Sequence, residues 1–126
     1  MRVFKVRSVA RFVRRERIGD GDLIEAIERA ERGIVDADLG AGLIKQRVAR
    51  PGQGRAGGFR VLVAFRIRDR AVFLYGFAKN ERDNIDPDEL ADLRELAESW
   101  LTASAEQLGR SLADGSLQEV EYGGGS

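Results

Sequence analysis

Residues 45–60 read Lys-Gln-Arg-Val-Ala-Arg-Pro-Gly-Gln-Gly-Arg-Ala-Gly-Gly-Phe-Arg and hold five cations, four glycines and no acid. Lys45 and Arg47 are two residues apart, so in an extended strand both side chains lie on one face of the sheet. Pro51 and the glycines that follow it are typical of a turn between two strands. The stretch therefore predicts a β-hairpin with a cationic face and a basic, glycine-rich loop.

Two interpretations of this hairpin compete. Its arginines can simply keep an exposed turn soluble, or the loop and the adjoining strands can bind phosphate groups through cationic side chains and backbone N–H groups. The cations are not confined to the loop, because Lys45 and Arg47 precede it and Arg60 opens the next strand. This distribution favours the phosphate-binding interpretation.

The segments around the hairpin predict an α+β fold. Residues 59–68 are β-branched, aromatic and almost continuously apolar, which is typical of a central strand, and residues 71–78 return as the next strand. With residues 43–49 they form an antiparallel meander. We expect one domain over residues 1–122 and a flexible tail at 123–126. Hydrophobic spacing and capping residues predict the remaining elements. These are a short strand at 2–6, a helical hairpin whose first helix is capped by Ser8 and whose second is capped by Asp20 or Asp22 and ends near Gly33, a helix from Pro87 to about Thr102, and a shorter helix between Ser104 and Gly115.

For two short segments we predict neither a helix nor a strand. Residues 36–42 contain small residues and are interpreted as a connection, and residues 117–122 are short and acidic. The helix from Pro87 is expected to bury one apolar stripe, made of Leu90, Leu93, Leu96, Ala97, Trp100 and Leu101.

The composition excludes several kinds of site. The chain has no Cys and no His, which removes disulfides, thiolate and Ser–His nucleophiles, and ordinary zinc or haem ligation. No acidic cluster has the spacing of a metal site, so we expect no metal and no cofactor. The apolar runs are too short to span a membrane and no signal peptide opens the chain, so we expect a cytoplasmic protein without membrane partners.

The zero net charge conceals two oppositely charged parts. Lys and Arg together number 21, and so do Asp and Glu, but the cations are in excess over residues 1–85 and the acids over residues 86–126. The basic part indicates a polyanion-binding face, and pairing between the two parts is the alternative.

RNA cleavage is a reaction that such a chain can support without histidine. It needs a group that takes the 2′-OH proton, cations that stabilise the pentacoordinate phosphorane, and an acid for the 5′-oxygen leaving group. Clustered Lys and Arg side chains can lower the pKa of one lysine and supply the stabilising charge. The residues permit this chemistry without requiring it.

Residues 43–65 and 73–82 resemble the RelE/HigB branch of the RelE/ParE superfamily, the toxins of type II toxin–antitoxin modules. The resemblance extends over most of residues 1–115. It implies a RelE-like microbial RNase fold, with a small antiparallel sheet, an N-terminal helical hairpin and C-terminal helices. It also implies a metal-independent endoribonuclease that cleaves translated mRNA in the ribosomal A site, and a cognate antitoxin that neutralises it in a hetero-oligomer.

The resemblance assigns roles to individual basic residues. Lys45 matches a family residue that can act as general base, and Arg60 and Lys79 match cations that stabilise the scissile phosphate in the transition state. Asn80 and Asp86 stand where RelE has a catalytic arginine and a tyrosine. Two further arginines that match the family, Arg47 and Arg82, are expected to contact the RNA. The same is expected of Arg50 and Arg55 in the longer loop.

Two other functions stay open at this point. A ParE-like toxin shares the fold but inhibits DNA gyrase and cleaves no RNA, and a catalytically silent homologue acts only through its antitoxin. The alternating cations Lys45 and Arg47, together with Arg60, favour the nuclease over the gyrase inhibitor.

Overall fold

The computed structural model describes residues 1–50, 54–82 and 84–122, except for the side chains of residues 50 and 54–56. The elements in chain order are β1 (Arg2–Val6), α1 (Arg7–Glu16), α2 (Asp20–Glu31), β2 (Ala37–Gly40), β3 (Leu43–Arg50), β4 (Gly54–Arg66), β5 (Arg70–Ala78), α3 (Pro87–Thr102), α4 (Ala105–Asp114) and β6 (Leu117–Val120). This arrangement confirms the predicted α+β class.

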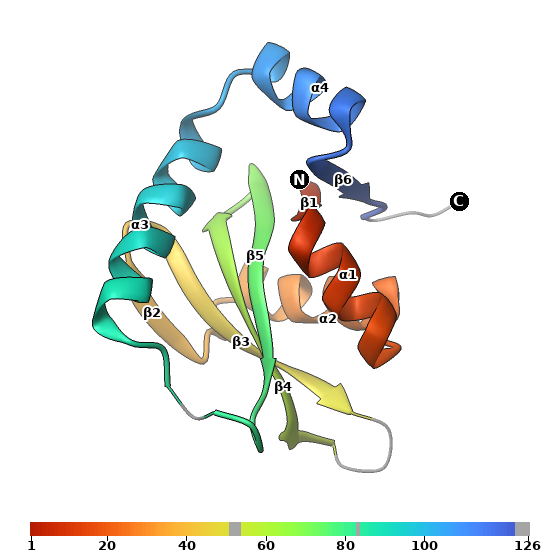
Figure 1. The fold of residues 1–126 in the computed structure, drawn as a ribbon, viewed down its shortest axis with the longest axis vertical. Coiled ribbons are helices and arrows are strands. Elements are labelled where there is room, and N and C mark those ends of the chain that lie inside the picture. The colour runs from red at the N-terminus through yellow and green to blue at the C-terminus, as the bar shows by residue number, and fades with distance from the viewer. Residues whose placement is uncertain (51–53, 83, 123–126) are drawn as a thin grey trace.

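The described residues form one six-stranded sheet in the order β2-β3-β4-β5-β1-β6 (Figure 1). The predicted meander β3-β4-β5 lies at its centre and is antiparallel. β1 pairs with β5 in parallel, and the helical hairpin and the strands β2, β3 and β4 lie between them in the chain. The sheet is thus mostly antiparallel, as a RelE-like fold requires.

The sheet separates two helical layers, each with its own hydrophobic core (Figure 1). β4 supplies both cores by strict alternation. Val61 and Val63 are fully buried on the side of α1 and α2, whereas Leu62 and Ala64 are fully buried on the side of α3 and α4. We call the side of α1 and α2 the hairpin face, after the helical hairpin that these two helices form. We call the side of α3 and α4 the α3 face.

Most of the predicted helix boundaries are confirmed by cap contacts. Gly33 adopts φ +82° after α2, and the N–H of Ile34 donates to the C=O of Arg29 at 2.8 Å, which is the six-residue Schellman bond. Ser104 and Gln107 cap α4 reciprocally: the Ser104 N–H donates to Gln107 Oε1 at 2.7 Å, and the Gln107 N–H donates to Ser104 Oγ at 3.1 Å. These local signals are therefore sufficient to place the end of α2 and the start of α4.

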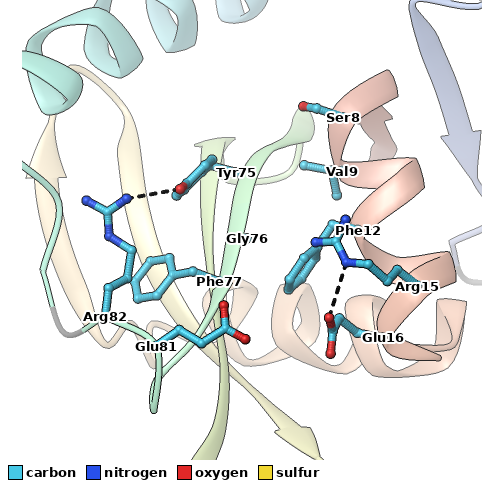
Figure 2. Close-up of a pocket in the computed structure, with 10 residues that line it drawn as sticks. All are labelled: Ser8, Val9, Phe12, Arg15, Glu16, Tyr75, Gly76, Phe77, Glu81 and Arg82. Carbon is cyan, nitrogen blue, oxygen red and sulfur yellow. Dashed lines mark hydrogen bonds and ion pairs between the residues drawn. The ribbon is translucent and has the colours of Figure 1, made fainter.

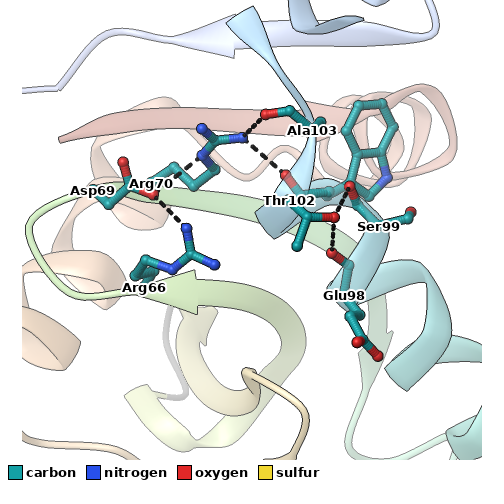
Figure 3. A network of polar contacts seen from close by, with 8 residues as sticks. Arg66, Asp69, Arg70, Glu98, Ser99, Thr102 and Ala103 are labelled. Atoms are coloured by element: carbon teal, nitrogen blue, oxygen red, sulfur yellow. Dashed lines mark hydrogen bonds and ion pairs between the residues drawn. The ribbon is translucent and has the colours of Figure 1, made fainter.

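The C-terminus of α3 is capped by a side chain from another element. The guanidinium of Arg70, at the start of β5, donates to the C=O groups of Trp100 and Ala103 at 3.0 and 2.8 Å (Figure 3). Asp69 pairs with Arg70 at 3.3 Å and with Arg66 at 3.2 Å, which fixes the β4–β5 turn beside the helix end. This turn thereby sets where α3 lies on its face of the sheet.

The sequence prediction missed the two edge strands. β2 pairs with β3, with Ala37 opposite Lys45, and β6 pairs with β1, with Val3 opposite Val120. Each is only four residues long. Such short segments acquire strand geometry from pairing with a neighbour, which the local pattern does not encode.

Four local predictions were wrong. Gly19, and not Asp20 or Asp22, occupies the N-cap position of α2, and its N–H donates to Asp22 Oδ2 at 3.1 Å. Ser8 does not cap α1, because β1 runs directly into the helix and Val6 occupies the N-cap position. β4 begins at Gly54 rather than at Phe59, since pairing with Arg50 beyond a bulge extends the hairpin across the glycines. Leu96 is 40% exposed, because α3 turns Ala97 and Leu101 toward the sheet instead.

Within the ranges that the structure covers, no helix combines the length and the apolar character needed to cross a bilayer.

Candidate functional site

Lys45, Arg47 and Arg60 lie on the α3 face, and we call this set the cationic face. Arg47 on β3 is directly opposite Arg60 on β4. Lys45 is opposite Leu62, so it is a diagonal neighbour of Arg60, within reach of long side chains. The strand register therefore brings together the three cations that the sequence analysis singled out.

Aromatic side chains of β5 continue the same face. Phe77 is opposite Arg60, and Tyr75 is opposite Leu62. Their ring centroids are 6.0 Å apart. The three cations thus adjoin an aromatic strip along the neighbouring strand.

The three cations differ in exposure. The side chain of Arg47 is 48% exposed, Lys45 is half-buried, and Arg60 is only 7% exposed. Arg60 Nη1 donates to the C=O of Phe59 at 3.3 Å. Arg47 Nε pairs with Asp36 Oδ2 at 3.0 Å. Arg47 is therefore the surface member of the cationic face, and Arg60 is its buried member.

β3 is held on its hairpin face by two buried polar side chains, Gln46 of the strand itself and Arg29 of α2. Gln46 is fully buried; its Nε2 donates to the C=O groups of Ala26 and Ile34 at 2.9 and 3.0 Å, and its Oε1 accepts from the N–H of Asp36 at 2.9 Å. Arg29 donates to the C=O of Arg47. Because Gln46 is held on the hairpin face, its two neighbours in the strand must point to the α3 face.

Sequence reasoning missed these positioning residues. The available signal was a glutamine between two cations in a strand whose other hairpin-face residues, Ile44 and Val48, are apolar. A polar residue at such a position is retained only if it is hydrogen-bonded.

Arg82 is held in a network at the end of the aromatic strip. Its guanidinium donates to Glu89 Oε1 at 2.7 Å and to the Tyr75 hydroxyl at 3.1 Å (Figure 2), and its Nε donates to the C=O of Asn84 at 3.0 Å. The hydrogen bond from Arg82 lowers the pKa of Glu89, and the same bond raises the pKa of Arg82. Arg82 therefore links Asn84 and Tyr75 to Glu89 of α3.

The structure describes the remaining expected site residues to different extents. Lys79 is exposed directly after β5, and its N–H donates to the C=O of Gly58 at 3.1 Å, so the β4–β5 pairing continues to its position. The side chains of Arg50 and Arg55 lie outside the described residues, although their backbones belong to β3 and β4. Asn80 is exposed, and Asp86 is the N-cap residue of α3.

A small pocket of about 110 Å³ opens beside Lys45. Phe77 and Asn84 line it together with apolar side chains, namely Leu39, Leu62, Ile85 and Leu90. It is an apolar recess next to the cationic face, of the kind that admits a flat ring or an aliphatic side chain.

The chemistry available at this site is that of cations and one phenol. Among the described residues, no group of three or more carboxylates is arranged to hold a metal ion. Three cations on paired strands can neutralise a phosphate and stabilise additional negative charge on it.

No curated protein matches the chain significantly. The family model of the RelE toxin of the RelE/RelB toxin–antitoxin system matches residues 1–120. That range includes the sheet, the cationic face and all four helices of the described chain. The chain therefore belongs to the RelE toxin family.

Proposed function

We propose that this toxin is a ribosome-dependent endoribonuclease that cleaves translated mRNA in the A site and so inhibits translation. The observation that carries the proposal is the register of β3 and β4, which aligns Arg47 with Arg60 and sets Lys45 diagonally beside them. Membership of the RelE family supports an RNase activity, and it implies an antitoxin as partner. Ribosome and mRNA are the proposed targets, and the site of action is the cytoplasm.

The proposed reaction uses the RNA's own 2′-hydroxyl as nucleophile. Lys45 is the proposed general base, and its side chain takes the 2′-OH proton while the 2′-oxygen attacks the adjacent phosphorus. The P–O5′ bond breaks and the 5′-oxygen takes a proton from solvent water. The products are a 5′-hydroxyl and a 2′,3′-cyclic phosphate, or a 3′-phosphate once water has opened the cyclic ester. Because the nucleophile is part of the substrate, no metal-bound water is needed.

Arg60 and Lys79 stabilise the charge that develops on the phosphorane. Arg60 has the more constrained position, since it is almost buried and preorganised donors stabilise a transition state most effectively. Lys79 approaches from the exposed end of β5. Their contributions should therefore be unequal, with that of Arg60 the larger.

The other cations bind the RNA backbone. Arg47 is the exposed member of the cationic face and is assigned to a flanking phosphate. Arg50 and Arg55 are assigned to mRNA or rRNA phosphates. Arg82 supports the site indirectly, through its hydrogen bond to Tyr75.

The test is inducible expression with and without the antitoxin gene, followed by primer extension on a translated reporter mRNA. We expect growth arrest with cuts inside codons, and loss of these cuts when translation is blocked. Arrest with intact mRNA and double-strand DNA breaks would instead identify a gyrase inhibitor. Absence of arrest would identify a silent homologue.

A further inference from the structure

One half of β5 has a strand neighbour on only one side within the described chain. β1 pairs with β5 from Arg2 opposite Arg70 to Lys5 opposite Phe73, and then turns into α1 at Arg7. Beyond Phe73, β5 pairs only with β4. Residues 74–78 of β5 therefore form an open sheet edge within the described chain.

The open edge presents backbone hydrogen-bonding groups. The Lys79 N–H donates to Gly58 on the β4 side at 3.1 Å. Because successive residues of a strand alternate in direction, Phe77 and Tyr75 also point their backbone groups at β4, and Gly76 points its N–H and C=O outward. The C=O of Ala78 already accepts from the N–H groups of Glu81 and Arg82, at 3.0 and 3.3 Å. The free pairing positions are centred on Gly76.

A groove of about 250 Å³ runs along this edge, between α1 and the segment after β5 (Figure 2). We call it the β5-edge groove. The residues that line it come from three segments: Ser8, Val9, Phe12, Arg15 and Glu16 of α1, Tyr75, Gly76 and Phe77 of β5, and Glu81 and Arg82. Figure 2 shows Gly76 between the side chains of Phe12 and Phe77, so the edge lies at the bottom of the groove.

Gly76 is required for this shape. A Cβ at this position would lie 2.5 Å from a ring carbon of Phe12. Phe12 also makes an edge-to-face contact with Phe59, at 5.6 Å between centroids. The glycine lets α1 approach the sheet closely while its own backbone stays accessible from the side.

The helix that forms one wall is strongly basic. Arg15 extends over the groove, with its guanidinium 5.7 Å from the ring centre of Phe12 and 3.3 Å from Glu16 Oε2. Exposed arginines of α1 and its C-cap position surround it, namely Arg11, Arg14 and Arg17. An extended segment lying in the groove would thus be favoured by acidic residues on its α1 side.

We propose that the β5-edge groove binds an extended, acidic segment of the antitoxin, which adds to the sheet as a strand beside β5. Backbone hydrogen bonds to Gly76 would supply affinity, and Arg15 would select acidic side chains. The proposal rests on the antitoxin partner that the family implies, and not on RNA cleavage. Phe77 lines both this groove and the pocket beside Lys45, so an occupant of the groove would contact the aromatic strip of the cationic face.

Amide hydrogen exchange of the toxin, alone and in complex with its cognate antitoxin, tests the added strand. We expect the Gly76 N–H to exchange about tenfold or more slowly in the complex, as a newly formed hydrogen bond requires. Unchanged exchange at Gly76 in a complex that has formed would overturn the proposal. Protection of Gly76 in the toxin alone that grows with concentration would overturn it too, because the occupant would then be a second copy.

Two charge reversals on α1 form the matched pair for the acidic selection. Arg15 lines the groove, whereas Arg14 is exposed on the same helix and does not line the groove. The two variants are Arg15→Glu and Arg14→Glu. We expect Arg15→Glu to weaken antitoxin binding by about tenfold and Arg14→Glu to have a much smaller effect. Equal weakening would mean that the helix attracts the antitoxin only by its overall charge. Neither measurement depends on RNA cleavage, so a failed nuclease assay leaves both interpretable.

Discussion

The two faces of the central sheet differ in how they treat polar side chains. On the hairpin face, Gln46 and Arg29 are buried and satisfy backbone carbonyls of their neighbours. On the α3 face, Arg47 and Lys45 keep access to solvent and only Arg60 is buried. Both faces are built from the same strands, since side chains alternate along β3.

If the cationic face binds RNA as proposed, this difference separates the residues that stabilise the fold from those that act on the substrate. The polar groups of the hairpin face are held by fixed partners and cannot receive a ligand without breaking those bonds. The α3 face is covered by α3 over Leu62 and Ala64, and beyond them it bears the cations and the aromatic strip. Substitutions on the two faces should therefore affect different observables.

Loss of Arg60 should have the largest effect of any single change on the α3 face. Arg60→Ala is expected to reduce mRNA cleavage by about 10²- to 10³-fold, the usual cost of removing a preorganised donor to a charged transition state. Cleavage would be measured by primer extension at matched expression levels.

Two control variants and the melting temperature of each variant separate a loss of catalysis from misfolding. Arg66→Ala, an exposed change on the same strand, should leave cleavage unaltered. Arg60→Lys keeps the charge but not the fork of donors, so it should recover only part of the activity. Full cleavage by Arg60→Ala with an unchanged melting temperature would remove Arg60 from the mechanism.

The sequence was sufficient for the meander and for most helix ends, because these depend on local signals. Alternation of Lys45 and Arg47 identified their shared face, and Gly33 and Ser104 identified helix boundaries through the bonds that caps require. Family resemblance, and not spacing, supplied the expected roles of Arg60 and Lys79.

The remainder depends on partners that are distant in the sequence. β2 and β6 exist through pairing with β3 and β1, and the buried Gln46 is explained only by carbonyls of Ala26 and Ile34. The open edge of β5 follows from where β1 stops. No local pattern carries such information, which is why these features became visible only in the folded chain.

On the hairpin face, Gln46→Leu should reduce stability without acting on the chemistry directly. The substitution leaves the Asp36 N–H and two carbonyls without the side chain that they bond, so we expect a loss of about 2–4 kcal/mol in the free energy of unfolding. Urea denaturation measures it. Gln118→Leu on exposed β6 should change the same quantity by less than about 0.5 kcal/mol. A cost for Gln46→Leu as small as this control would show that the buried network does not hold β3.

Substitution of Gly76 tests how closely β5 packs against α1 of the helical hairpin. Gly76→Ala should cost about 1–3 kcal/mol, because the added methyl group overlaps the ring of Phe12. Adding Phe12→Leu should relieve part of that overlap, so the double variant should lose less than the sum of the single changes. Gly21→Ala is the control: no atom lies within 4 Å of the added Cβ, and a helical alanine is favourable.

Replacement of Glu89 should give the smallest effect, because its carboxylate is 41% exposed and water screens the pair with Arg82. The pKa of Glu89 is lowered in the folded chain, so the pair adds stability at neutral pH and loses it as the pH falls below about 4.5, the ordinary value. Glu89→Gln should therefore lower the melting temperature slightly at pH 7, and the difference from the wild type should vanish in acid. Glu95→Gln, exposed on the same helix, should show no such convergence. A Glu89→Gln deficit that persists unchanged in acid would mean that the carboxylate acts through packing rather than charge, and the α3 face would then resemble the hairpin face after all.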